Sequence, residues 1–410
     1  MITRESMNNN LEPTRIHNIK NPLLTIFLCF AVAVLEGFDI QAVGVAAPKL
    51  APEFGFNPGQ MGWLFSISNI GLVIGASFGG WLADRVGRKP VFIASVIIFG
   101  LFTLATSYAS NYDAFFVVRF LTGLGFGAAL PNMMALASEI SSAENKALTA
   151  AVIFCGMPLG GGTSALITQF LPSNFDWRTL FVIGGLLPAL LAPALYFFMA
   201  ETLDRSKARV QTTHSTVTAL FGEGRATPSL LLWIIFLPTL MILYLILNWL
   251  PTLVVGNGLP KAVAPQASIA FNYASVVGAL CFGYVVDRMG TRWPLAIAYG
   301  VLIVVLIQLG SAKDLSSILL FSAGAGFFLM GANYSLYGVA APYYPKAMRG
   351  TGSGASVAVG RVGSILGPML AGELLKGGAS TTTVMQYLTP MAAIAGVAVV
   401  ALSFYKKAEE

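Results

Sequence analysis

Residues 80–89 of the chain read Gly-Trp-Leu-Ala-Asp-Arg-Val-Gly-Arg-Lys, and residues 283–292 read Gly-Tyr-Val-Val-Asp-Arg-Met-Gly-Thr-Arg. Four residues of the first stretch return in the second at a common displacement of 203 positions (287 − 84 = 203): Gly80, Asp84, Arg85 and Gly87 recur as Gly283, Asp287, Arg288 and Gly290. A pair further along, Gly123 and Gly326, shares this offset. The sequence therefore indicates an internal duplication.

Long apolar runs surround both stretches. The chain is 56% hydrophobic and only 10% charged, which leaves too little polar surface for a water-soluble globule. Runs of roughly 20 residues, enough to cross about 30 Å of hydrocarbon as helix, occur about twelve times. They are far longer than the strands of an outer-membrane barrel. We predict an all-α membrane protein whose helices lie near 23–47, 59–83, 91–109, 113–137, 147–171, 179–199, 230–254, 265–286, 294–311, 315–341, 351–375 and 384–405.

The longest polar break divides the runs into two halves of six. The predicted organisation is a polar N-terminal tail, a first six-helix half, a linker, a second half and a short tail, at residues 1–22, 23–199, 200–228, 229–405 and 406–410. The first apolar run has no small-residue cleavage site behind it, so we expect a retained membrane helix instead of a signal peptide. The linker is shorter than the roughly 40 residues of an independently stable domain, which argues against a receptor with a signalling module.

Basic residues predict the orientation. Most of the 24 Lys and Arg lie at the chain ends or in alternate loops, including the two duplicated stretches. The positive-inside rule makes those loops, and both termini, cytoplasmic. The expected location is a multi-pass position in a bacterial-type inner membrane. The net charge of +6 follows from this asymmetry and does not indicate nucleic-acid binding.

Cysteine and histidine are scarce. Cys29, Cys155 and Cys281 lie in different apolar runs, and the two histidines, His17 and His214, lie in polar segments. Their spacing suggests neither a disulfide nor a metal site, and it removes most routes to metal or Ser-His-Asp catalysis. We therefore expect no enzyme activity, no metal and no cofactor besides a proton gradient.

The duplicated stretch resembles the loop signature of the major facilitator superfamily between its second and third helices. This resemblance implies a secondary carrier with two six-helix halves and a substrate site between them near the midplane. We interpret the signature as a cytoplasmic gate in which Asp and Arg residues form a network that holds one conformation and releases in another. Its residues are Gly80, Asp84, Arg85, Gly87, Arg88, Gly283, Asp287 and Arg288. The alternative is a basic loop that only sets topology.

Four charged residues fall inside the predicted helices, where a charge is costly and usually has a partner or a function. Glu36 and Asp39 lie in the first helix, Arg119 in the fourth and Arg361 in the eleventh. At 1.5 Å per residue, Asp39 and Arg119 lie roughly 12 and 10 Å from the outer face, and Arg361 lies near the midplane. These groups are close enough in depth to share one cavity.

Residues 35–41, Leu-Glu-Gly-Phe-Asp-Ile-Gln, resemble the acidic first-helix motif of the aromatic acid/proton symporters, with Glu36 where that family usually has Asp. The closest resemblance is to transporters of 3-(3-hydroxyphenyl)propionate and hydroxycinnamates. It implies that Asp39 and Glu36 take part in proton coupling, with Arg119 and Arg361 as charge partners for coupling or substrate, and it does not distinguish the two arginines. Because an arginine fork can hold a carboxylate through two parallel hydrogen bonds, we prefer Arg361 for the substrate contact. The alternative for Arg119 is a structural pair with Asp39.

Aromatic and amide side chains complete the predicted site. The candidates for ring stacking and for bonds to phenolic hydroxyls are Trp249, Tyr244, Asn333, Tyr334 and Tyr337, although most aromatics in such a chain pack against helices or lipid. Glycines in the fourth and fifth runs are expected to permit close helix packing. We expect a protein surrounded by membrane lipid that acts as a monomer.

Two other carriers remain open as alternatives. A symporter of a non-aromatic organic acid would need the same buried charges. A drug/proton antiporter would share the fold, but its fifth helix usually carries an adjacent Gly-Pro pair. This chain has Gly156-Met157-Pro158 there, which favours uptake.

Overall fold

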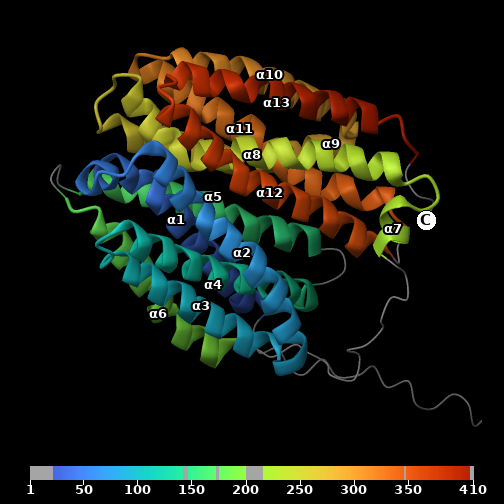
Figure 1. Cartoon of the computed structure of the whole chain (residues 1–410). Helices are drawn as coiled ribbons and strands as arrows, with labels where there is room; N and C mark the ends of the chain where they lie inside the picture. Colours follow the sequence, from blue (N-terminus) through green and yellow to red (C-terminus); the bar gives the residue numbers. More distant parts are fainter. Residues whose placement is uncertain (1–21, 142–145, 172–174, 200–215, 346–347, 407–410) are drawn as a thin grey trace, which may run out of the picture.

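The computed structural model describes residues 22–141, 146–171, 175–199, 216–345 and 348–406 of the chain (Figure 1). Within them, twelve helices are long and apolar enough to span a membrane. The first six are α1 (Pro22–Phe54), α2 (Pro58–Val86), α3 (Arg88–Thr106), α4 (Tyr112–Ile140), α5 (Lys146–Phe170) and α6 (Arg178–Phe198). The other six are α8 (Ala226–Gly256), α9 (Val263–Met289), α10 (Arg292–Ser311), α11 (Leu315–Ala340), α12 (Arg349–Lys376) and α13 (Thr381–Leu402). The prediction of twelve helices is confirmed.

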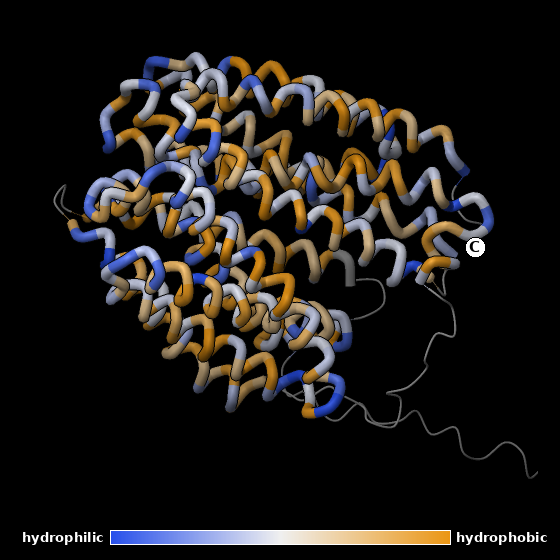
Figure 2. The backbone as a smooth tube through the Cα atoms, in the orientation of Figure 1, coloured by the Kyte–Doolittle hydropathy of each residue, from blue (hydrophilic) through white to orange (hydrophobic). Residues whose placement is uncertain are grey.

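Hydropathy follows the helices. Figure 2 shows hydrophobic residues along the shafts and hydrophilic residues gathered at both ends of the molecule. The apolar shafts are continuous helices, which satisfy the backbone hydrogen bonds of a segment that crosses hydrocarbon.

The two halves repeat one pattern of helix neighbours. In the first half α2 packs on α4, α1 on α5 and α3 on α6, and in the second α9 packs on α11, α8 on α12 and α10 on α13. Figure 1 shows the halves as two groups of helices. The duplication read from the sequence is thus a duplication of architecture.

The connection between the halves is described only in part. All but the last residue of the predicted tail 1–22, most of the linker 200–228 and both histidines lie outside the described residues. The described part of the linker contains the short helix α7 (Thr216–Phe221). Buried Arg225 donates from Nε to the carbonyl oxygen of Ala219 at 3.0 Å and so holds α7 against the start of α8. The second half begins at Ala226, slightly before the predicted boundary.

The signature glycines have a conformational reason. Gly87 has φ 121° between α2 and α3, and Gly290 has φ 77° between α9 and α10. Residues with a side chain rarely adopt such angles, so glycine permits the abrupt reversal from one membrane helix to the next. The same geometry in both halves accounts for the recurrence of this glycine.

Other glycines bring helices into backbone contact, as predicted. A Cβ at Gly160 would lie 1.8 Å from the carbonyl oxygen of Val34 on α1, and one at Gly127 would lie 2.0 Å from that of Leu72 on α2. No side chain fits at those distances. The α1–α5 and α2–α4 pairs therefore depend on glycine for their close approach.

Contacts between the halves are concentrated toward one end of the molecule. Ser66 Oγ donates to the carbonyl oxygen of Ile365 at 2.6 Å, and Gln169 Nε2 donates to that of Ala262 at 3.3 Å. Both bonds lie toward the helix ends opposite the signature loops. Among the described residues, the hydrogen bonds between the halves run from that end to Tyr334, whose hydroxyl donates to the carbonyl oxygen of Phe154 at 3.1 Å. The structure is therefore closed at the end that the charge pattern predicts to be external.

Candidate functional site

A small cavity lies where α1, α5, α8, α11 and α12 meet, between the two halves. Its volume is about 60 Å³. Arg361 borders it, with Nη1 donating to the hydroxyl oxygen of Tyr244 at 2.7 Å. The remaining lining residues are Gly37, Ile40, Gln41, Phe154, Met157, Pro158, Leu240, Leu243, Leu247, Met330, Asn333, Tyr334 and Tyr337. Among these lining residues Arg361 carries the only charge.

The cavity gathers most of the residues that the sequence suggested for substrate contact: Arg361, Tyr244, Asn333, Tyr334 and Tyr337. Trp249 does not line it. The indole Nε1 of Trp249 donates to the carbonyl oxygen of Pro368 at 2.9 Å, and its ring packs edge-on against Phe65. In this conformation Trp249 joins the halves instead of facing the cavity.

Arg119 also lies away from the cavity, in a buried ion pair with Asp39. Its Nη1 is 2.8 Å from Oδ2 of Asp39 and donates to Oδ1 at 3.0 Å. Thr103 on α3 donates a further hydrogen bond to Oδ1 at 2.7 Å. Both charged side chains are buried, at 2% and 0% exposure. The pair thus joins α1, α3 and α4 within one half, which is the structural alternative that the sequence left open.

Glu36 lies one turn before Asp39 and differs from it in its surroundings. Its side chain is fully buried, and neither carboxyl oxygen has a hydrogen-bond partner among the described residues. Its neighbour Gly37 lines the cavity. The four predicted buried charges therefore separate into a closed pair, Asp39 with Arg119, and two groups near the interface between halves.

An amide pair crosses that interface beside the cavity. Gln41 Nε2 donates to Oδ1 of Asn272 at 2.8 Å, and Asn272 Nδ2 donates to Oε1 of Gln41 at 2.7 Å. Both side chains are buried. A Cβ at Gly161 would lie 1.8 Å from Gln41 Nε2, so glycine leaves the room that this amide occupies.

Sequence reasoning missed this pair and also missed Phe154. Gln41 follows the acidic motif directly, and Asn272 is an amide inside an apolar run, so buried amides were the available signal. Their mutual contact connects α1 to α9 across 231 residues, which no local pattern reveals. Nothing in the sequence distinguishes Phe154 from the many other phenylalanines of the chain.

The signature arginines make equivalent contacts in the two halves. Arg85 stacks over Trp81 with its guanidinium carbon 3.9 Å from the ring centroid, and Arg288 stacks over Tyr284 at 4.5 Å. Arg88 forms an ion pair with Glu139 at the end of α4. None of the ion pairs given for the described residues joins one half to the other. The gate therefore stays a prediction.

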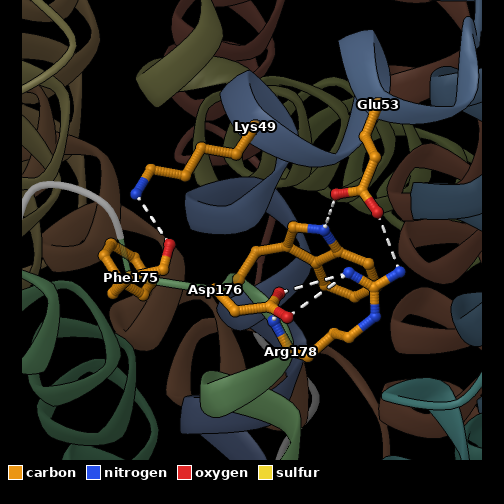
Figure 3. Close-up of polar contacts among 6 residues, drawn as sticks. Lys49, Glu53, Phe175, Asp176 and Arg178 are labelled. Atoms are coloured by element: carbon orange, nitrogen blue, oxygen red, sulfur yellow. Dashed lines mark hydrogen bonds and ion pairs between the residues drawn. The ribbon is translucent and has the colours of Figure 1, made fainter.

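A polar cluster closes the opposite end of the first half. Figure 3 shows Glu53, near the end of α1, accepting hydrogen bonds from Trp177 Nε1 at 2.6 Å and from Arg178 at 2.8 Å. Lys49 donates to the carbonyl oxygen of Phe175 at 3.1 Å. These contacts attach the segment that leads into α6 to the last turns of α1, and they stiffen the end at which the halves meet.

Comparison with known proteins places this geometry in a family. The model of the Major Facilitator Superfamily matches residues 29–368 and again residues 267–410. The 3-(3-hydroxy-phenyl)propionate transporter of Escherichia coli (strain K12) is 38% identical, with 92% of this chain and 93% of that relative covered. The 4-hydroxybenzoate transporter PcaK of Pseudomonas aeruginosa is 34% identical, with 91% of each covered. A gallate transporter of Pseudomonas putida is 31% identical, with 92% and 91% covered.

A solved structure has the same fold. It is a bacterial homolog of the human lysosomal transporter Spinster, in an inward-facing and occupied conformation. Its TM-score is 0.78 at 15% identity, over 94% of this chain and 97% of that one. With its twelve helices and duplicated halves, this chain is a multi-pass inner-membrane protein that belongs to the Major Facilitator Superfamily.

Proposed function

We propose that this protein takes up a small aromatic carboxylate, such as a hydroxyphenylpropionate, hydroxycinnamate or hydroxybenzoate, together with protons by alternating access. The observation that carries the proposal is the cavity between the halves, whose lining has Arg361 as its only charged residue. The curated relatives, which are named as aromatic-acid transporters, support the substrate class.

The charge of the cavity favours an anion. Arg361 has a neutral partner, the Tyr244 hydroxyl, and its guanidinium can hold a carboxylate through two parallel hydrogen bonds. In a low-dielectric site this contact is strong, because no acidic side chain among the lining residues competes for it. We assign the substrate carboxylate to Arg361.

The walls favour an aromatic ring that carries a hydroxyl group. Phe154 packs against Tyr334 and Tyr337 with ring centroids 6.0 Å apart in each case, which gives one side of the cavity an aromatic surface. Asn333 is buried, and its Oδ1 has no hydrogen-bond partner among the described residues. A phenolic hydroxyl of the substrate would donate to this oxygen and remove the cost of leaving it unpaired.

Proton coupling is assigned to Glu36. An ionised carboxylate that is fully buried without a partner is strongly disfavoured, so Glu36 keeps a proton in this state. When the proton leaves, the new negative charge attracts Arg361 and repels the bound carboxylate, so substrate and proton leave together. Asp39 cannot act in this way without breaking its buried pair with Arg119.

The small size of the cavity supports a mechanism of alternating access. Its volume of about 60 Å³ is far below the roughly 300–1,000 Å³ of pockets that hold small ligands. Substrate entry therefore requires the halves, or the side chains between them, to separate. The contacts that would have to break at the closed end include the Gln41–Asn272 pair.

Uptake by proteoliposomes tests the proposal. We expect labelled hydroxyphenylpropionate, hydroxycinnamate or hydroxybenzoate to accumulate under an imposed inward proton gradient. The Arg361→Lys variant should bind about tenfold more weakly, since lysine cannot form the two-bond contact. Accumulation that ignores the gradient would exclude symport, and preference for a non-aromatic acid would exclude the aromatic assignment. Glu36→Gln should lose gradient-driven accumulation and keep exchange of substrate across the membrane.

A further inference from the structure

A second hollow lies on the outer surface of the helices, between α10 and α13. Its volume is about 760 Å³, and its lining is almost entirely apolar. Tyr299 forms part of it, with the hydroxyl turned inward to Thr239 at 2.6 Å. A Cβ at Gly300 would meet nothing within 4 Å, so the glycine faces open space. The other lining residues are Ala296, Ile303, Ala392, Ala393, Gly396, Val397, Val400, Ala401, Phe404 and Tyr405. We call this the α10–α13 groove.

The length of the groove matches one leaflet of a bilayer. Along α13 it runs from Ala392 to Ala401, which is about 14 Å at 1.5 Å per residue, and it continues past the end of the helix to Phe404 and Tyr405. Half of the roughly 30 Å hydrocarbon core is about 15 Å. Large apolar side chains on both helices are exposed, among them Ile297 at 57% and Val397 at 70%. The surface around the groove therefore faces lipid.

A basic group lies at one end of the groove. Arg292 precedes Ala296 by four residues and Gly300 by eight, so it continues the same face of α10. Its guanidinium carbon is 4.4 Å from the ring centroid of Phe404, a lining residue. Its Nε is buried and has no hydrogen-bond partner among the described residues. The Arg292 side chain as a whole is only partly buried, so the rest of its guanidinium can donate to an acceptor that an incoming ligand supplies.

The surrounding charges favour an anion at this end. Lys406 follows the groove residue Tyr405, and the end of α9 contributes Arg288 and Asp287. The described side chains there thus supply three positive charges and one negative charge. This is the end of the signature loops, where the positive-inside pattern predicts the cytoplasmic membrane surface.

We propose that the α10–α13 groove binds an anionic phospholipid, with an acyl chain along the groove and the phosphate against Arg292. The acyl chain fills the space in front of Gly300, and the phosphate accepts hydrogen bonds from the guanidinium, for which arginine geometry is well suited. The site is separate from the cavity between the halves and does not depend on the substrate.

Crosslinking of the wild-type protein tests the location. Protein reconstituted with phosphatidylglycerol that carries a photoreactive acyl chain should give crosslinked peptides enriched in residues 292–303 and 392–405. The same probe with a phosphatidylcholine head group should crosslink there several-fold less. Crosslinks spread evenly over all lipid-facing helices would overturn the proposal, and so would a groove covered by a second copy of the chain, detected as a protein–protein crosslink at these residues.

Two variants test the parts of the site separately. Native mass spectrometry of detergent-purified protein measures how much phosphatidylglycerol is retained. Arg292→Gln should lower this retention about tenfold. Lys313→Gln, a charge change at the opposite end of α10, should not lower it. Gly300→Leu should fill the groove and reduce the retention of phosphatidylglycerol and phosphatidylcholine alike. Retention by both groove variants equal to that of the wild type would refute the site.

Discussion

Asp39→Asn and Glu36→Gln make the same chemical change one turn apart on α1, yet we expect different effects on stability. Asp39 Oδ2 lies 2.8 Å from Arg119 Nη1. At an effective dielectric constant of about 20 this distance corresponds to a gross attraction of roughly 6 kcal/mol. Removing one partner of a buried pair costs about 3–5 kcal/mol, because the other charge stays buried and uncompensated. Among the described residues Glu36 has no hydrogen-bond partner to lose, so Glu36→Gln should change stability by about 1 kcal/mol or less.

The assay is equilibrium unfolding of purified protein in mixed micelles titrated with a denaturing detergent and followed by circular dichroism. Asp39→Asn should lower the fraction of denaturing detergent at which half of the protein is unfolded. Glu36→Gln should leave this midpoint close to that of the wild type. The double variant Asp39→Asn/Arg119→Met serves as the control. It should regain at least half of the loss, because no uncompensated charge remains. An Asp39→Asn protein as stable as the wild type, or a Glu36→Gln protein that loses as much as Asp39→Asn, would refute the division of roles.

Three further predictions concern the interface between helices. Tyr244→Phe removes the 2.7 Å hydrogen bond that orients Arg361, and it should weaken binding of a labelled aromatic acid about tenfold. Unchanged affinity would show that this bond does not organise the site. Gln41→Leu removes both hydrogen bonds between Gln41 and Asn272 and leaves Oδ1 of Asn272 without its partner, although Nδ2 still donates to the carbonyl oxygen of Ser268. Outer-end cysteine probes should therefore become more reactive, whereas the double change with Asn272→Leu should restore protection. No difference between the single and double variants would contradict this. Gly160→Ala places a Cβ 1.8 Å from a carbonyl oxygen and should lower the free energy of unfolding by about 1–3 kcal/mol. The control Gly338→Ala faces open space and should not lower it. Equal unfolding midpoints for the two variants would argue against the α1–α5 contact.

Most of the fold could be predicted because a membrane leaves few choices. A chain must satisfy its backbone hydrogen bonds inside each spanning segment, so continuous apolar runs translate almost directly into helices. The repeated Gly87 and Gly290 also indicated the topology of the two halves. Both glycines have a positive φ, which permits the same reversal between two membrane helices in each half. Helix pairing was beyond such reasoning, since it depends on which glycine meets which backbone carbonyl.

The sequence predicted which residues form the candidate site better than it predicted how they are arranged. Intramembrane charges are rare enough that Glu36, Asp39, Arg119 and Arg361 could be selected from the sequence alone. Depth along the helices brought them to similar levels. Depth does not reveal how a helix is rotated about its axis. This rotation directs Asp39 toward Arg119 and Thr103. Glu36, three residues earlier, has no hydrogen-bond partner among the described residues. Trp249 illustrates the same limit, because its ring turns to Pro368 and Phe65.

The distribution of buried charges also limits where coupling can occur. A pair enclosed within one half, such as Asp39 and Arg119, keeps the same surroundings when the halves move as rigid bodies, and its energy then cancels between the two states of the cycle. Groups at the interface between halves change surroundings. Arg361 in the second half lines the cavity, and Glu36 in the first half directly precedes the lining residue Gly37. A ligand can bias a conformational equilibrium only through interactions that differ between states, which is why we assign the proposed coupling of substrate to protons to these two groups.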